Sequence, residues 1–321
     1  MRRRDPADAW TCTFCGTGRS GTRKSTARAS ACLCAECAER STRMLADRWR
    51  ERAEGILLRA LRQPDPTAGG GRTSGGAGPL DRRVWRGHPF WYRRDTSDLE
   101  IIREVLSQPW SRGAYWVPAA IKPRVILDVG GHIGVAAVYL ASLFPDAKIY
   151  TFEPVPDNFA LLSRNIGPYP NIEAFPIALG KEDGVVEIWY PEDHTNLGGF
   201  SFFEAAADRR RTIPVEMRHP RELLTTLGIT RVDVVKIDAE GAEYDVLTGL
   251  DPALLKSTGW ITGELHGERD AELLDYLSRW FDLNVTRSPG ARLSRFEACN
   301  KALAPGLSST RRAGRDGRGR R

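Results

Sequence analysis

The chain has 321 residues, of which 41% are hydrophobic and 27% are charged, a composition typical of a globular protein with a buried core. No apolar run reaches the ~18–20 residues of a membrane-spanning helix, and the basic start lacks the apolar segment of a secretory signal. We therefore expect a soluble, cytoplasmic protein without a membrane partner. The net charge of +6 is uneven, because residues 67–305 hold 27 basic and 32 acidic residues and the basic excess lies in the two ends. This distribution disfavours a central nucleic-acid groove, which would need a basic face.

Two Cys-x2-Cys pairs stand near the start of the chain, Cys12 with Cys15 and Cys34 with Cys37. Two such pairs at this spacing can supply four thiolates to one tetrahedral Zn²⁺ ion. A module of about forty residues is too small to hold a core unaided, so metal binding would stabilise it. We therefore predict a structural zinc site with these four ligands. Two alternatives stay open: Cys32 could replace Cys34, or the thiols could be unliganded.

Composition then divides the chain into four parts. Residues 1–62 form the cysteine module, which ends in an amphipathic stretch that would pack on the module or pair two chains. Residues 63–80 are rich in Gly, Pro, Ser and Thr and are expected to be a flexible linker. Residues 81–305 carry alternating strand and helix patterns. Residues 306–321 form a basic tail that we expect to be disordered and solvated, with polyanion binding as an alternative.

Short apolar strands alternate with helices after the linker. The expected strands are 125–127, 148–152, 172–177, 185–189, 233–237 and 260–265. The expected helices begin near residue 96 and cover 135–144, 158–165 and 247–256. This alternation predicts an α/β fold, a mostly parallel sheet with helices on both faces, which binds ligands beyond the carboxyl ends of its strands. That edge singles out four acids at strand ends: Asp128, Glu153, Asp238 and Glu264.

A glycine-rich turn, Gly130-Gly131-His132-Ile133-Gly134, follows the first of these strands. Glycine lets the backbone turn tightly and approach a ligand closely. Glu153 closes the next strand, where a carboxylate can accept the ribose hydroxyls of an adenosyl cofactor. Asp128, in front of the glycines, could hold a cationic amino-acid group but would repel a pyrophosphate, and the turn lacks the G-x-G-x-x-G spacing of dinucleotide sites. The pattern therefore favours S-adenosylmethionine over NAD.

Several segments occur together and in order: LDVGGHIG, YTFEPVPDNFALLSRN, ALG, NLGGFS and VDVVKIDAEGAEYDVL. Over roughly residues 85–285 the chain resembles the FkbM family of S-adenosylmethionine-dependent methyltransferases. The upstream RRDTSDLEIIREVL is similar to the segment that opens many members. The chain departs from the family at Gly131-His132, where Ala-Asn is usual, so a side-chain contact at position 132 is in question although the backbone turn is kept.

The resemblance implies a Rossmann-like, class I methyltransferase fold with S-adenosylmethionine as cofactor. By the same resemblance, Asp128, Gly130 and Gly134 frame the methionine end of the cofactor, Glu153 holds its ribose, and Ala178-Leu179 lines its adenine. Asp238, Glu240 and Glu243 would lie beside the reactive face. The implied cofactor-binding residues are Asp128, Gly130, Gly131, Gly134, Glu153, Ala178, Leu179 and Asp238. The alternative for KIDAEGAE is a plain strand followed by a helix with an acidic first turn.

Methyl transfer from a sulfonium is an in-line displacement, and a base helps when the acceptor is a hydroxyl. The expected catalytic residues are Asp238, Glu240 and His266, with His132 and His194 as further candidates for the base. Asp238 and Glu240 could alternatively hold a divalent cation. The function that we expect is O-methylation of a hydroxyl on a small molecule, such as a secondary metabolite or a sugar.

The cysteine segment CTFCG…CLCAECAERSTRML is similar to the four-cysteine zinc-binding domain of the ClpX chaperone ATPase, over about residues 10–50. That resemblance implies homodimerisation or docking of a protein partner. The chain has no Walker-type phosphate loop, which excludes an ATPase. Two alternative functions remain open: a recruitment protein whose degenerate transferase domain only binds cofactor, and a methyltransferase that acts on a macromolecule.

Overall fold

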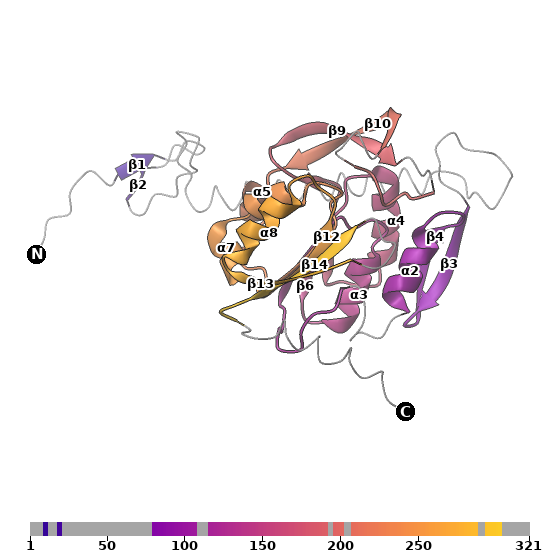
Figure 1. The fold of residues 1–321 in the computed structure, drawn as a ribbon, viewed down its shortest axis with the longest axis horizontal. Helices are drawn as coiled ribbons and strands as arrows, with labels where there is room; N and C mark the ends of the chain where they lie inside the picture. Colours follow the sequence, from indigo (N-terminus) through magenta and orange to yellow (C-terminus); the bar gives the residue numbers. More distant parts are fainter. Residues whose placement is uncertain are drawn as a thin grey trace, which may run out of the picture.

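The computed structural model in Figure 1 describes residues 9–11, 18–20, 79–107, 115–191, 195–201, 207–287 and 293–303. Its centre is a seven-stranded sheet in the order β13-β14-β12-β11-β5-β6-β7. The strands are β5 (Val125–Val129), β6 (Lys148–Phe152), β7 (Ile172–Phe175), β11 (Val234–Ile237), β12 (Trp260–Leu265), β13 (Phe281–Thr286) and β14 (Ser294–Asn300). Within this sheet β14 pairs antiparallel with both neighbours, and the β7-β6-β5-β11-β12 ladder is parallel. The predicted mostly parallel sheet is confirmed.

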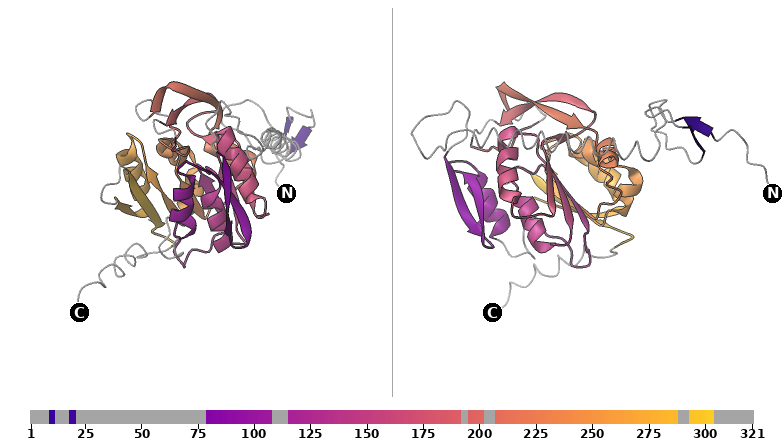
Figure 2. Two further views of the ribbon diagram at one scale, coloured as in Figure 1. Left: turned by 90° about the vertical axis from the view of Figure 1, so that its right-hand side faces the viewer. Right: turned by 180° about the vertical axis from the view of Figure 1, so that it is seen from behind.

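Helices cover both faces of the sheet, as Figure 2 shows from two further directions. One face packs against α2 (Asp98–Leu106), α3 (Val135–Leu143) and α4 (Pro156–Ile166). The other packs against α5 (Pro220–Thr226), α6 (Glu243–Gly249), α7 (Pro252–Ser257) and α8 (Asp270–Ser278). Successive strand residues point to opposite faces, so Ile126 joins the first core and Leu127 the second. This alternation explains why the apolar strands read as continuous runs in the sequence.

The stretch 247–256, which the sequence suggested to be one helix, is two. Leu250 has extended backbone (φ −62°, ψ 154°) and ends α6. Pro252 then occupies the first turn of α7, and Asp251 caps this helix by accepting the N–H of Ala253 at 2.8 Å. Proline has no N–H to continue the preceding helix but suits the first turn of a new one, so the break follows from the Asp-Pro pair.

Two further β units pack around the central sheet. The hairpin of β3 (Leu80–Trp85) and β4 (His88–Arg93) contributes Phe90 and Tyr92 to the core under α2 and α3. A three-stranded sheet, β8-β10-β9, is formed by β8 (Ala178–Leu179), β9 (Gly184–Pro191) and β10 (Ala207–Arg218), with β9 and β10 at the top of Figure 1. The apolar contacts of this small sheet include Val155, which follows β6 directly.

Near the start of the chain, β1 (Ala9–Thr11) and β2 (Gly18–Ser20) form an antiparallel pair on either side of the segment that holds Cys12 and Cys15. All four cysteines expected to bind zinc lie outside the described residues, as do the amphipathic stretch and the basic tail. The zinc module and the four domain boundaries therefore stay predictions. In the described part of the chain, no helix combines the length and the apolar character needed to cross a membrane.

Candidate functional site

A cavity of about 540 Å³ opens at the carboxyl ends of the central strands β5, β6, β11 and β12. Sites for small molecules and cofactors have volumes of roughly 300–1,000 Å³, and in open α/β sheets they lie at this edge. The cavity is lined by residues of the glycine turn, of the β6 and β11 ends, of β8 and of the loop 195–201. Among the predicted site residues, those lining it are Gly130, Gly131, Glu153, Ala178, Leu179, Asp238, Glu240 and His266.

The glycine turn is held by close backbone contacts. The N–H groups of Gly130 and Gly131 both donate to the carbonyl of Phe152, at 3.0 and 2.9 Å. Gly130 has φ +78°, and a Cβ there would overlap the carbonyl oxygen of Asp238. A Cβ on Gly131 would overlap the hydroxyl of Thr151. Glycine is therefore required at position 130, where the backbone of Asp238 leaves no room for a side chain, whereas the atoms closest to Gly131 belong to side chains that can shift.

A row of polar side chains crosses three strands below this turn. The register pairs Asp128 of β5 with Lys236 of β11 on one side and with Thr151 of β6 on the other. All three are buried: Thr151 donates to Asp128 Oδ2 at 2.8 Å, and Lys236 Nζ lies 3.3 Å from Asp128 Oδ1. Directly opposed residues of neighbouring strands face the same side of the sheet, so this row follows from the register alone.

Lys236 links the row to the turn. Its Nζ donates to the carbonyl of Gly130 at 2.5 Å and to that of Val129 at 3.2 Å. Burial opposes the charge of this ammonium, but the adjacent carboxylate of Asp128 outweighs it and keeps the pKa of Lys236 above its ordinary value. The lysine thus stays charged and holds two carbonyls of the turn.

Asp128 was expected to meet a cationic group of the cofactor, but its carboxylate is fully buried and does not line the cavity. Its charge is met by Lys236, a residue that sequence reasoning did not single out. A signal was present, since a lysine inside the apolar run Val234-Val235-Lys236-Ile237 can be buried only with a partner. Gly134 also lies outside the cavity lining, where its φ of +89° starts α3.

Glu153, at the end of β6, lines the cavity with a carboxylate held by the protein. Its Oε2 accepts the N–H of His132 at 2.7 Å, and its Oε1 accepts the N–H of Val155 at 2.9 Å and the amide of Asn158 at 3.4 Å. Burial raises the pKa of Glu153 to about 7, against these hydrogen bonds, which lower it. A carboxylate has about four acceptor positions, so this oriented group keeps capacity to accept a ligand hydroxyl.

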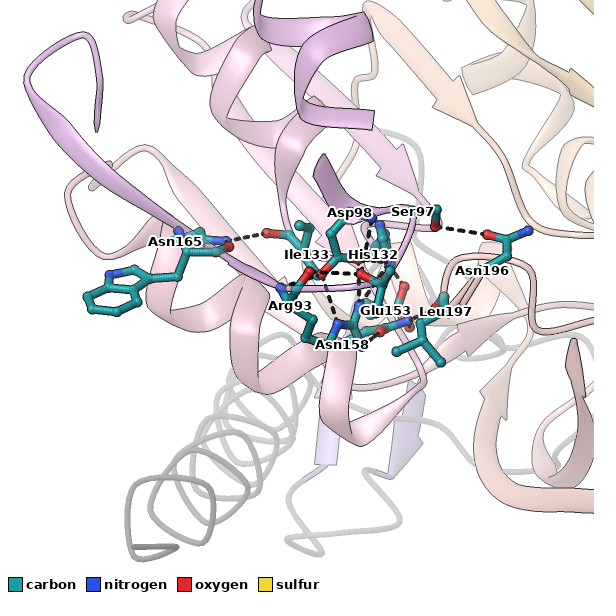
Figure 3. A network of polar contacts seen from close by, with 12 residues as sticks. Arg93, Ser97, Asp98, His132, Ile133, Glu153, Asn158, Asn165, Asn196 and Leu197 are labelled. Atoms are coloured by element: carbon teal, nitrogen blue, oxygen red, sulfur yellow. Dashed lines mark hydrogen bonds and ion pairs between the residues drawn. The ribbon is translucent and has the colours of Figure 1, made fainter. Parts of the chain in front are cut away.

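A buried network joins Glu153 to the hairpin of β3 and β4 (Figure 3). Arg93 of β4 forms a two-pronged ion pair with Asp98 of α2, at 2.8 and 3.0 Å, and donates to Asn158 Oδ1 at 2.8 Å. Asn158 also donates to the carbonyl of Leu197, in the loop 195–201. The segment RRDTSD of the sequence therefore supports the end of the cavity that holds Glu153.

His132 lies in this network and not among the proton acceptors. Its Nε2 is 3.1 Å from Arg93 Nη2 and 3.4 Å from Asp98 Oδ1. Burial, assisted by the charge of Arg93 and opposed by that of Asp98, lowers the pKa of His132 to about 4, which leaves the ring neutral near pH 7. Its φ of +49° is a left-handed conformation in which asparagine is favoured among non-glycine residues. Position 132 thus adopts a backbone geometry that suits asparagine, and the His132 ring is held by the Arg93–Asp98 network.

At the other end of the cavity, His266 stands among four carboxylates. Its Nδ1 lies 3.0 Å from Glu243 Oε1, and its Nε2 is 3.7 Å from Asp238 Oδ1 and 3.8 Å from Glu240 Oε2. Burial opposes the charge of His266, but the Glu243 hydrogen bond and the charges of Glu240 and Asp238 outweigh it and raise the pKa to about 10. The three predicted catalytic residues are therefore brought together in one cluster.

The surroundings of this acid–histidine cluster are also acidic. Glu264, from the end of β12, places Oε2 3.7 Å from His266 Nε2 and accepts Arg295 through Oε1 at 2.9 Å. Burial, together with the neighbouring carboxylates, raises the pKa of Glu240 to about 8. Glu240 also has a left-handed backbone, φ +48°. Non-glycine residues are held in this region only where the surroundings enforce it, and such residues gather at functional sites.

Loop residues complete the wall. Asn196 lines the cavity and accepts a hydrogen bond from Ser97 at 3.3 Å. Ser201 donates to the carbonyl of Glu240 at 3.2 Å, so it supports the strained turn. His194, a further candidate for the base, lies outside the described residues.

Comparison with known proteins bears on residues 128–284, which match the model of the methyltransferase FkbM domain. The chain is 28% identical over 252 residues to the AMB antimetabolite synthetase AmbE of Pseudomonas aeruginosa, covering 65% of this chain and 12% of that protein. It is 31% identical over 148 residues to Methyltransferase 1 of Beauveria bassiana, covering 39% of this chain and 58% of that protein. It is 26% identical over 184 residues to the 2-O-methyltransferase NoeI of Sinorhizobium fredii, covering 51% of this chain and 69% of that protein. The chain thus spans less than two thirds of the first two relatives.

Proposed function

We propose that the chain, whose residues 128–284 match the model of the methyltransferase FkbM domain, transfers a methyl group from S-adenosylmethionine to a hydroxyl of a small molecule or sugar. The observation that carries this proposal is the arrangement of one cavity. Its cofactor end holds the glycine turn and Glu153, and its other end holds the cluster of Asp238, Glu240 and His266. A relative named as a 2-O-methyltransferase supports oxygen as the accepting atom.

In this proposal the cofactor lies along the glycine turn. Glu153 accepts its ribose hydroxyls, and Ala178 and Leu179 of β8 contact its adenine. The turn offers backbone groups of Gly130 and Gly131 to the methionine end. Asp128 and Gly134 would support the turn without contacting the cofactor. Asp128 pairs with Lys236, and Gly134 lies at the start of α3. The cofactor supplies an electrophilic methyl group, and the protein supplies its orientation.

The acceptor hydroxyl would enter at the acid–histidine cluster. Within the described part of the chain, no hydrogen bond reaches the carboxylate of Asp238 or that of Glu240, although both line the cavity. Each of these carboxylates, when ionised, can therefore accept the proton of a hydroxyl. His266 is held by Glu243 and would position the hydroxyl between them.

The test is calorimetric titration of S-adenosylmethionine into the full-length protein and into Glu153→Ala. We expect micromolar binding by the wild type and its loss in the variant. Glu182→Ala, which removes an exposed carboxylate away from the cavity, is the matched control and should bind as the wild type does. A folded wild type that does not bind the cofactor would overturn the proposal and favour a recruitment protein. Binding of S-adenosylmethionine without methylation of any hydroxyl compound would favour the alternative in which a degenerate transferase domain only binds the cofactor.

The proposal includes a zinc module at Cys12, Cys15, Cys34 and Cys37 that docks a partner or dimerises the chain. Its support is the ligand spacing alone. We expect one zinc per chain by atomic absorption, lost in Cys15→Ser. Cys32→Ser should retain the metal, and loss of zinc there would instead make Cys32 a ligand. A metal-free wild type would remove the module from the proposal.

A further inference from the structure

The acid–histidine cluster has the geometry of a cation site. One oxygen each from Asp238 and Glu264 and a ring nitrogen of His266 lie within 4.8 Å of one another. Asp238 follows β11, while Glu264 and His266 belong to the end of the neighbouring parallel strand β12. Because carboxyl ends of adjacent parallel strands meet at the same edge, the three ligand atoms converge without a long loop.

The second observation is the state of His266. Its side chain is 6% exposed, and its Nδ1 is hydrogen-bonded to Glu243 at 3.0 Å. Its Nε2 faces Asp238 and Glu264 at 3.7 Å each, beyond hydrogen-bond distance, and no other hydrogen bond reaches it from the described ranges. A buried ring nitrogen that faces a gap between carboxylates can act as a metal ligand once the entering ion displaces its proton.

Glu243 supplies the outer support that such a histidine needs. Its two oxygens accept the N–H groups of Ala239 and Gly241, at 2.9 and 3.0 Å, and its side chain is 1% exposed. It therefore cannot rotate away from His266. A carboxylate that holds the far nitrogen of a ligating histidine fixes its tautomer and orientation.

Charge leads to the same conclusion. Glu264 meets Arg295 through Oε1, which leaves Oε2 directed toward the cluster, and Arg295 is shared with Glu104. Among the described residues, the ion pairs of Asp238 and Glu240 are with His266, and the nearby ammonium of Lys236, whose charge also interacts with Asp238, is already paired with Asp128. The cavity end thus carries more carboxylates than cations, and a divalent ion would balance them.

We infer that Asp238 Oδ1, Glu264 Oε2 and His266 Nε2 bind a divalent cation, with Glu240 beside it. Two carboxylate oxygens and one imidazole nitrogen suit Mn²⁺ or a similar ion, and water would fill the remaining positions. The carbonyl of Asp238 packs against Gly130, so the ion lies next to the turn that would hold the cofactor. The site would therefore face the acceptor hydroxyl.

The role of the ion rests on the proposed function. Coordination lowers the pKa of the acceptor hydroxyl, and Glu240 takes its proton. The hydroxyl oxygen then forms a bond to the methyl carbon as the carbon–sulfur bond breaks. The electron pair of that bond stays on sulfur, which becomes the neutral thioether of S-adenosylhomocysteine. This inference makes an acceptor with a second oxygen near the methylated one, as in a vicinal diol, the best substrate class, because both oxygens can bind the ion.

The experiment is Mn²⁺ titration of the full-length protein followed by electron paramagnetic resonance, which counts free and bound ion without any activity measurement. We expect one Mn²⁺ to bind the wild type, with affinity reduced tenfold or more in Asp238→Asn and in His266→Gln. Glu243→Gln should weaken binding 10- to 100-fold through His266. Glu222→Gln, an exposed carboxylate on α5, is the control and should leave binding unchanged. Circular dichroism establishes that each variant is folded.

Unchanged Mn²⁺ binding in folded Asp238→Asn and His266→Gln, or no binding by the wild type, would overturn the inference. Titration of the same samples with S-adenosylmethionine separates the two failures. Cofactor binding without Mn²⁺ binding would leave the proposed function standing and remove only the cation. Mn²⁺ binding without cofactor binding would support the cation site and overturn methyl transfer.

Discussion

The two ends of the cavity treat their charges in opposite ways. At the cofactor end, Asp128 is paired with Lys236, Arg93 is paired with Asp98, and Glu153 accepts three hydrogen bonds. At the acceptor end, several carboxylates face one another and His266. The ring of His266 lies beyond hydrogen-bond distance of Asp238 and Glu240. The side chains of the first end are held by partners within the protein. Those of the second end can still bind a cation, a proton or a hydroxyl. In the proposed function, the paired charges lie where the cofactor would be oriented, and the unpaired carboxylates lie where the methyl group would be transferred.

This contrast predicts that removing a charge destabilises the protein at one end and stabilises it at the other. The largest effect is expected for Lys236→Met. Loss of the ammonium leaves the Asp128 carboxylate buried without its counter-ion and frees the carbonyls of Val129 and Gly130. Breaking a buried ion pair by removing one partner costs about 3–5 kcal/mol. Denaturant unfolding monitored by circular dichroism measures the loss.

The double variant Lys236→Met, Asp128→Asn is the control, since it removes both charges. It should recover a substantial part of the lost stability because the uncompensated carboxylate is gone. A single variant as stable as the wild type would show that the row of Lys236, Asp128 and Thr151 does not anchor the turn.

The row also shows where sequence reasoning stops. An apolar run followed by an acid marks the end of a strand, and this pattern located Asp128, Glu153, Asp238 and Glu264 at the carboxyl edge of the sheet. Their partners depend on register and on distant segments, which no local pattern specifies. Asp128 was assigned to the ligand because Lys236, 108 positions later, could not be placed beside it in advance.

Other features were hidden for related reasons. Arg93 lies in the hairpin of β3 and β4, whose arginine-rich sequence does not alternate cleanly between apolar and polar residues. The antiparallel strands β13 and β14 were not among the expected strands, because polar residues interrupt both sequences and neither forms an apolar run. The strand ends and the glycine turn were therefore predictable, whereas the network that supports them required the folded chain.

A smaller effect, at the boundary between the two ends, is expected for His132→Asn. The pKa of His132 falls to about 4 in the folded state from an ordinary 6.5, because it is buried. The unfolded chain therefore binds a proton below pH 6.5 that the folded chain does not, and the stability contributed by this group is lost as the pH falls toward 4. Asparagine does not titrate, so it adds no pH dependence of this kind to the stability. It also tolerates the left-handed backbone.

The wild type should thus lose about 2 kcal/mol of stability relative to His132→Asn between pH 7 and pH 5, at ~1.4 kcal/mol for each pKa unit. Urea unfolding of both proteins across this range gives the difference directly. A constant difference at all pH values would mean that His132 has the same pKa in the folded and unfolded states, and the lowered pKa inferred for the ring in the Arg93–Asp98 network would be wrong.

The smallest effect, and the one of opposite sign, is expected for Glu240→Gln at the acceptor end. Above the pKa of about 8 at which Glu240 ionises, glutamine keeps the size of the side chain but removes one negative charge from beside Asp238 and Glu264, so mutual repulsion falls. The two proteins are therefore compared at a pH above 8. Measured with a chelator present, the variant should be more stable than the wild type by about 1 kcal/mol, the size of a substitution that relieves a functional site. Methyl transfer should fall at the same time, because the proposed proton acceptor is gone. Glu182→Gln, on an exposed turn away from the cavity, should change neither quantity. A destabilised Glu240→Gln would mean that the Glu240 carboxylate is already satisfied in the unliganded protein, and the opposition between the two ends of the cavity would no longer hold.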